Sequence, residues 1–239
     1  MNRPPIPSRC PLPALILILG VCFCPFSVLA DEPGQTISNP GFRPPSEHAA
    51  DFLDNAGAMQ IAVLPTLVRR VERTAHSFAS QQQIVDFLNE SGIATARANS
   101  LRIDLGPLRR PSQWEIFQYG ALSVAEQLED RAPNADYTIV MEILVPGNQS
   151  VFGIELYILD RQGNSAFSFL LNSHHELFAD AKLEAKDSSE ASRDTMIENA
   201  TRIGLIALMA QIEQARECLA ASSEFTATAV GPGVLHDFQ

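Results

Sequence analysis

Three apolar runs separated by short turns constrain the fold of this chain more than any other feature. The run DYTIVMEILV (136–145) is almost continuously apolar, which is typical of a central strand covered on both faces of a sheet. The runs VFGIELYIL (151–159) and AFSFLL (166–171) alternate between apolar residues and other residues, as half-buried strands do. Because turns as short as PGNQS and DRQGNS join neighbouring strands, the pattern predicts an antiparallel meander.

Further strands and helices are predicted on either side of the meander. QIAVLP (60–65) is typical of a short buried strand, and in 93–107 the alternation of Leu101, Ile103 and Leu105 with charged residues predicts a half-buried strand. Three segments have helical patterns: 80–92, with Ser80 as N-cap and Gly92 as C-cap, 111–133, and 187–217.

The predicted order is therefore β-α-β-α-β-β-β-α. It describes an α/β (α+β) fold, in which a mixed sheet with a C-terminal antiparallel meander packs against helices. In the last helix the apolar stripe is expected to cross the sheet, and it consists of Ile197, Thr201, Leu205, Leu208 and Ile212.

The N-terminus has the pattern of a secretory signal peptide. Arg3 and Arg9 precede an apolar run without acidic residues, and small residues at Val28 and Ala30 predict cleavage after Ala30. The apolar run is short for a transmembrane helix. We expect a periplasmic or secreted protein with no stable membrane insertion after signal removal. Lipidation at Cys22 is an alternative to the free soluble form.

The chain is accordingly divided into four parts. Residues 1–30 form the signal peptide, 31–57 a flexible leader rich in proline and polar residues, 58–218 a single α/β domain, and 219–239 a disordered tail. Cys218 is the one cysteine outside the signal, so the domain is expected to fold without an intramolecular disulfide.

The charge of the chain disfavours two classes of partner. The formal net charge is −11, which disfavours nucleic acid and anionic lipid as partners. The basic clusters VRRVER and PLRRP are short, and we expect them to be solvated surface. No nucleotide-binding loop, hydrolase elbow or dinucleotide fingerprint is present, and no cofactor or catalytic residue is predicted.

Two adjacent histidines in FLLNSHHELF are the candidates for a metal site. A zincin needs His-Glu-x-x-His on a helix, but the position of the second histidine after His175 is occupied by Ala179. His174 and His175 would also point to opposite faces of a continuing strand. A metal site would need additional ligands from elsewhere in the chain, such as His76, Asp180 or Glu184. We therefore expect His174 and His175 to mark the end of a strand.

Two glutamates lie on strands that are predicted to be neighbours. Glu142 and Glu155 could face each other, and paired carboxylates are suited to acid–base chemistry. Glu155 is on the polar side of its strand and is expected to be exposed. Glu142 lies within an apolar strand, and if it is buried it needs a cationic partner, for which Arg97 or Arg102 is available.

Short runs of the sequence resemble known envelope proteins. The layout with IAVLP early and NADYTIVMEIL after a helix resembles small α/β modules of the bacterial envelope, such as the amino-terminal domain of the Tol-system propeller protein and the lipoprotein activators of peptidoglycan synthases. The runs DYTIVMEIL, ILDRQGN and LLNSHHELF resemble an uncharacterised family of exported bacterial proteins. These resemblances imply a fold and bring no known activity.

Two functions are therefore compared. The first is an exported, non-catalytic module that binds an envelope protein or a small ligand. The alternative is a metal-dependent hydrolase centred on His174 and His175.

Overall fold

The computed structural model describes residues 47–108, 113–129, 131–147, 149–172, 175–179, 181 and 183–229. They form an α/β fold in which a mixed, seven-stranded sheet packs against helices, as the sequence predicts. Among the described helices, none combines the length and the apolar composition that a membrane crossing requires.

The central strand of the sheet is β5 (Tyr137–Leu144), which is buried along its whole length. Strands β1 (Gln60–Val63) and β2 (Thr66–Arg69) follow each other along one edge of β5, both parallel to it, with Pro65 between them. Proline has no backbone N–H to donate, so it interrupts the ladder at this position.

Two more four-residue strands extend the sheet beyond β1 and β2. β4 (Thr95–Ala98) is parallel to β1, and β3 (Thr74–Ser77) is antiparallel to β2. The sequence analysis did not predict β2 or β3.

The predicted antiparallel meander is confirmed. β6 (Gly153–Asp160) pairs with the other edge of β5, and β7 (Ser165–Asn172) pairs with β6. Gly163 has φ 82° in the turn between them, a left-handed conformation that glycine adopts without steric cost.

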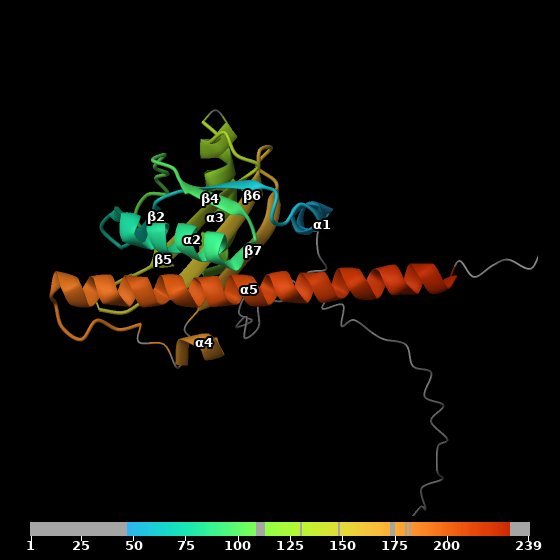
Figure 1. Ribbon diagram of the computed structural model, residues 1–239. Helices are drawn as coiled ribbons and strands as arrows, with labels where there is room; N and C mark the ends of the chain where they lie inside the picture. The colour runs from blue at the N-terminus through green and yellow to red at the C-terminus, as the bar shows by residue number, and fades with distance from the viewer. Residues whose placement is uncertain are drawn as a thin grey trace, which may run out of the picture. The chain divides into compact units, whose positions relative to one another are not determined.

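Helices α1 (Glu47–Asp54), α2 (Phe78–Ser91) and α5 (Glu190–Ala229) pack into the larger hydrophobic core with one face of the sheet. Figure 1 shows α2 and α5 side by side over the strands. All members of the predicted α5 stripe are buried, which confirms the orientation of this helix: Ile197, Thr201, Leu205, Leu208 and Ile212.

A second, smaller core lies on the opposite face of the sheet. Helix α3 (Gln113–Glu129) covers this face and contacts β6. Its Val124 and Leu128 pack with Val140 of β5 and Leu159 of β6. The sheet is therefore covered on both faces, which explains why β5 is almost continuously apolar.

The predicted strand at Leu101–Leu105 is wrong, because the strand of this region is β4, a few residues earlier. After β4, side chains accept hydrogen bonds from backbone N–H groups two residues later, a local pattern that a regular strand does not have. The Asn99 side chain accepts from the Leu101 backbone N–H, and that of Asp104 accepts from Gly106 N–H, each at 2.8 Å. Ile103 is nevertheless buried in the smaller core.

Several predicted boundaries also need correction. The leader expected over 31–57 contains α1, whose Phe52 is fully buried and packs edge-to-face on Tyr137 and Phe167. Helix α5 continues beyond residue 218, where a tail was expected. The N-cap of α2 is Ser77 rather than Ser80, since the Ser77 hydroxyl accepts from Ser80 N–H. The predicted signal peptide lies outside the described residues.

Candidate functional site

The two glutamates singled out in the sequence lie opposite each other in the sheet. Glu142 of β5 is in register with Glu155 of β6, so the prediction that they face each other is confirmed. The expectation that Glu155 is exposed is wrong, because both residues are fully buried. The alternation in β6 correctly separates two faces, but α3 covers the face that was expected to meet water.

The cationic partner of Glu142 is Arg69. Arg69 Nη1 donates to Glu142 Oε1 at 2.6 Å, and its Nε donates to the Gly106 carbonyl at 3.1 Å. The predicted partners Arg97 and Arg102 are both exposed, and the Arg102 guanidinium lies over the Phe78 ring instead. The sequence analysis missed Arg69 because it did not predict the strand β2 that places it next to β5.

Tyr157 completes this buried polar cluster. Its hydroxyl donates a short hydrogen bond to Glu155 Oε2. Gly120 of α3 lies directly above, and a Cβ at this position would be 2.5 Å from the Tyr157 hydroxyl oxygen and 3.3 Å from Glu155 Oε2. The close approach of α3 to the cluster therefore requires glycine at position 120.

Burial controls the ionisation of the carboxyl pair. Burial and, secondarily, the charge of Glu142 raise the pKa of Glu155 to about 8, although the Tyr157 hydrogen bond and Arg69 act in the opposite direction. Burial also raises the pKa of Glu142, against the attraction of Arg69. Two buried carboxyl groups on directly paired residues do not both ionise readily, and Arg69 is bonded to Glu142, so Glu155 is the member expected to hold a proton.

The arrangement is suited to a structural role. A neutral carboxylic acid beside a carboxylate is a pattern that enzymes use for proton transfer, but here both groups are fully buried beneath α3. A general acid must lie within hydrogen-bonding reach of a substrate, which this closed geometry does not provide.

The structure describes one of the two candidate metal ligands. His175 is partly buried and its Nδ1 accepts a hydrogen bond from Leu177 N–H at 3.2 Å, while His174 lies outside the described residues. Of the proposed distant ligands, His76 Nε2 is 3.0 Å from the Ile103 carbonyl oxygen and Glu184 forms an isolated bridge with Ser150. Within the described residues, no three His, Cys, Asp or Glu side chains are grouped closely enough to hold a metal ion.

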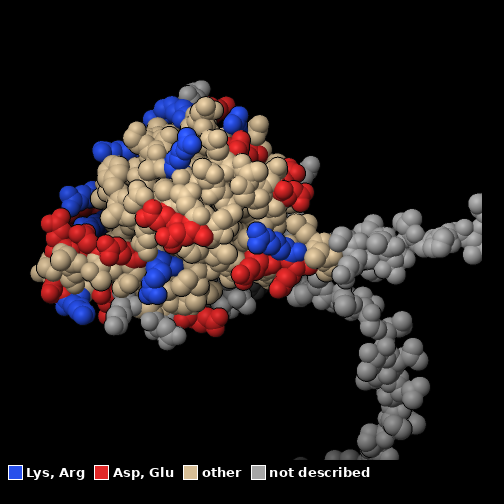
Figure 2. Space-filling view, in the orientation of Figure 1, with Lys and Arg blue, Asp and Glu red and all other residues tan. Residues whose placement is uncertain are grey.

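A surface groove runs between α2 and α5. It has a volume of about 610 Å³, and Phe87 and Leu205 contribute apolar side chains to it. Its charged lining is mainly acidic, and includes Asp86, Glu90 and Glu198 with the single cation Arg202. In Figure 2, acidic and basic side chains are interspersed over the visible face, with uncharged surface between them.

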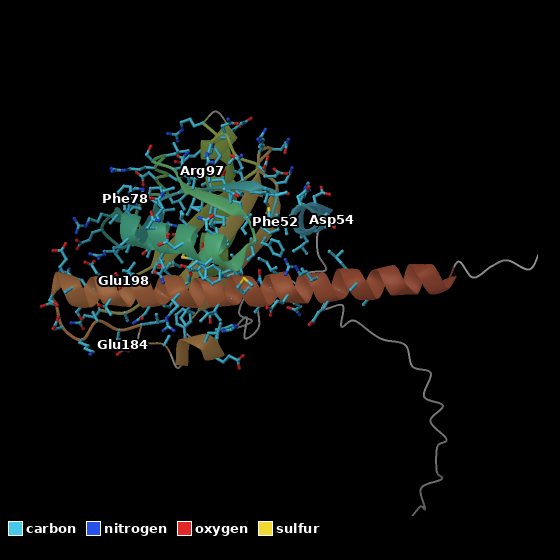
Figure 3. The ribbon with its side chains drawn as sticks, in the orientation of Figure 1. Phe52, Asp54, Phe78, Arg97, Glu184 and Glu198 are labelled. Atoms are coloured by element: carbon cyan, nitrogen blue, oxygen red, sulfur yellow. The ribbon has the colours of Figure 1, made fainter. Side chains whose placement is uncertain are left out.

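A second hollow of about 350 Å³ lies between α5 and the short helix α4 (Glu176–Ala179). Arg202 and Ile206 line both hollows, so they stand on a ridge of α5 with a hollow on each side. Ile206 is 41% exposed and is one of the few large apolar side chains on the described surface. Figure 3 labels Glu198 on α5 and Glu184 below it, near α4.

The α2–α5 groove also contains a polar group without a partner. Gln83 Oε1 is buried and accepts no hydrogen bond from any described residue. A buried acceptor left unpaired typically costs about 1–3 kcal/mol. A donor from a bound molecule would remove this cost.

Sequence analysis did not identify the groove. Ile206 is the available signal, because it is a large apolar residue that lies off the buried stripe of α5. A single exposed apolar side chain is common on protein surfaces, so Ile206 becomes a signal only together with the two hollows beside it.

Comparisons with known proteins give little further information. No family model matches the chain, and no curated protein matches it, so the predicted resemblance to an exported family stays a prediction. The C-terminal domain of LpoB from Salmonella enterica is 12% identical, with 52% of this chain and 90% of that one covered and a TM-score of 0.31. Escherichia coli LpoB is 14% identical, with coverages of 71% and 94% and a TM-score of 0.26. At such TM-scores the likeness carries no argument.

Proposed function

We propose that this protein is an exported, non-catalytic module that binds a protein partner through the α2–α5 groove. The observation that carries the proposal is the exposed Ile206 on a ridge between two hollows, beside the half-buried side chain of Phe87. Apolar side chains gathered in a concave surface with a polar rim are typical of protein-binding sites. The signal-like N-terminus supports export to the periplasm or the exterior.

The groove favours one kind of occupant, an amphipathic helix of the partner. A groove between two helices accepts the apolar face of a third helix, whose anchors recur every three or four residues. The acidic rim formed by Asp86, Glu90 and Glu198 favours basic residues beside those anchors. A lysine, arginine or amide donor would satisfy Gln83 Oε1.

The binding proposal is tested with two exposed apolar residues on different helices. Ile206→Asp places a charge on the ridge, whereas Leu122→Asp makes the same kind of change on α3, where Leu122 is 62% exposed. Circular dichroism should show that both variants fold. Partners captured from envelope extracts by the wild type should be retained by Leu122→Asp and bound at least about tenfold more weakly by Ile206→Asp. Equal binding by both variants would refute the proposal.

The alternative function is a metal-dependent hydrolase centred on His174 and His175. The described contacts do not favour it, since His175 Nδ1 already accepts a backbone hydrogen bond. Zinc titration followed by NMR separates the two functions, with the wild type compared with the His174→Ala/His175→Ala double variant. Stoichiometric binding that is lost in the double variant would support the hydrolase instead of the binding module.

A further inference from the structure

The two buried glutamates each have one carboxyl oxygen without a partner. Arg69 donates to Glu142 Oε1, which leaves Glu142 Oε2 buried and bonded to no described residue. Tyr157 donates to Glu155 Oε2, which leaves Glu155 Oε1 in the same state. Directly opposite residues of an antiparallel pair have Cβ atoms about 4.5–5.5 Å apart, so the two carboxyl groups are neighbours on one face of the sheet. One proton carried by Glu155 would serve both unpaired oxygens.

The charges of the cluster also require this proton. Arg69 forms an ion pair with Glu142, and the two charges cancel. An ionised Glu155 would add a negative charge at a fully buried position, where an uncompensated charge costs much free energy. The cluster is neutral only with Glu155 protonated.

The other elements packed against Glu155 bring no second cation. The residue paired with it on β7 is Leu170, which is apolar. Of the acidic residues on α3, Glu126 and Glu129 are exposed and do not enter the cluster. Among the described residues, the ionisable groups in contact with the two carboxyls are therefore Arg69 from β2 and Tyr157 from β6.

Helix α3 seals the cluster at Gly120. A Cβ at this position would lie 2.5 Å from the Tyr157 hydroxyl oxygen and 3.3 Å from Glu155 Oε2. A space too tight for a methyl group is also too tight for a water molecule. An ionised Glu155 carboxylate can therefore be hydrated only if α3 moves away from the sheet.

We propose that α3 is a pH-responsive lid, held closed on the β5–β6 pair by the proton of Glu155 and released as the pH rises and this proton is lost. Opening would expose the smaller core, in which Val124 and Leu128 of α3 pack with Val140 and Leu159 of the sheet. The lid lies on the face opposite the α2–α5 groove, so the inference does not depend on the proposed function.

The direction of the response follows from the two states of Glu155. In the closed state burial, followed by the charge of Glu142, raises the pKa of Glu155 to about 8. In the open state the carboxyl group meets water and returns toward its ordinary pKa of 4.5. Between these values opening releases a proton, so each pH unit favours the open state by up to about tenfold. The stabilisation of the closed state is complete below the lower value and is lost as the pH rises to the upper one.

Amide hydrogen exchange of the wild-type protein between pH 5.5 and about 8 tests the lid directly. Rates are divided by those of unstructured peptides of the same sequence at the same pH, which removes the intrinsic effect of pH. The protection of α3 amides should fall by up to about tenfold per pH unit. The protection of α2 amides, on the other face of the sheet, should change much less. Constant protection of α3, or an equal loss in α2 and α3, would overturn the proposal.

Two glutamine variants identify the group that responds. Glu155→Gln imitates the protonated acid, because its amide oxygen accepts from Tyr157 and its amide N–H can donate to Glu142 Oε2. The protection of α3 should then be independent of pH. Glu126→Gln is the matched control, since it makes the same change at an exposed position of the same helix and should keep the wild-type response. A wild-type response in Glu155→Gln, or a flattened one in Glu126→Gln, would contradict the assignment to Glu155.

Discussion

The two faces of the β5–β6 pair are covered by helices in chemically different ways. On the face toward α5, Gly204 lies against the Met141 and Ile154 side chains, and the contacts are apolar. On the face toward α3, Gly120 lies against the Tyr157 hydroxyl and the Glu155 carboxyl. Both helices use a glycine to approach the sheet, but only the second one covers ionisable groups.

This difference shows what each face contributes. The apolar face gains stability from burial, which does not depend on direction and tolerates exchange between similar side chains. The polar face depends on a particular set of hydrogen bonds, since each buried charge costs free energy unless it is paired. The α3 face is therefore expected to be more sensitive to the loss of a single partner, while the opposite layer builds the main core and the surface with the groove.

The largest expected effect is the loss of Arg69. Arg69→Met leaves the Glu142 carboxyl buried without its cation, and breaking a buried pair in this way typically costs about 3–5 kcal/mol. Denaturant unfolding measures this loss. The double variant Arg69→Met/Glu142→Leu should recover most of it, because an apolar pair of similar volume replaces the ion pair. A loss below about 1 kcal/mol for Arg69→Met alone would show that the cluster is not closed as described.

Truncation on the apolar face should have a comparable or smaller effect. Leu156 is fully buried in the larger core, and Leu156→Ala should cost about 2–5 kcal/mol through lost burial and a residual cavity. Leu122→Ala, at an exposed position of α3, should stay within about 0.5 kcal/mol of the wild type. Similar midpoints for the two variants in denaturant would contradict the strand orientation.

Replacing Gly120 and Gly204 by alanine, one at a time, compares the two faces of the sheet under the same substitution. Gly120→Ala should destabilise by about 1–3 kcal/mol, because the Tyr157 hydroxyl is held in place by Glu155 and cannot easily withdraw. Gly204→Ala meets the flexible end of Met141 at 2.8 Å, which can move aside, while the gain in helix propensity of up to about 1 kcal/mol applies to both substitutions. The net destabilisation by Gly204→Ala should therefore be smaller than that by Gly120→Ala. Thermal unfolding of the two variants measures the difference. A greater loss of stability for Gly204→Ala than for Gly120→Ala would contradict the expected order.

The pH dependence of stability should distinguish the faces as well. The pKa of Glu155 is raised to about 8 in the folded protein, so between its ordinary value and pH 8 the folded state holds a proton that the unfolded state releases. The stabilisation is complete below the unfolded pKa and declines as pH rises, by at most about 1.4 kcal/mol per pH unit for one proton. Glu155→Gln should flatten this decline. A variant with the same slope as the wild type would show that Glu155 does not titrate in this window.

The sequence predicts the fold better than it predicts the polar cluster. The strands β5, β6 and β7 have eight residues each, and they were found from a continuous apolar run in β5 and from alternation in β6 and β7. The strands β2 and β3 have only four residues each. Arg69 could not be predicted as a partner without β2. Alternation separates the two faces of β6 but says nothing about what covers them, so the burial of Glu155 depends on α3, an element more than twenty-five residues away in the sequence.

Site-specific photo-crosslinking in the source organism tests the central claim, that binding takes place on the α5 surface. A photoreactive side chain is placed at Ile206, between the two hollows, and separately at Leu122 on α3, both exposed apolar positions. We expect a discrete crosslinked product from Ile206 and none from Leu122. A discrete product from Leu122 with none from Ile206 would contradict it.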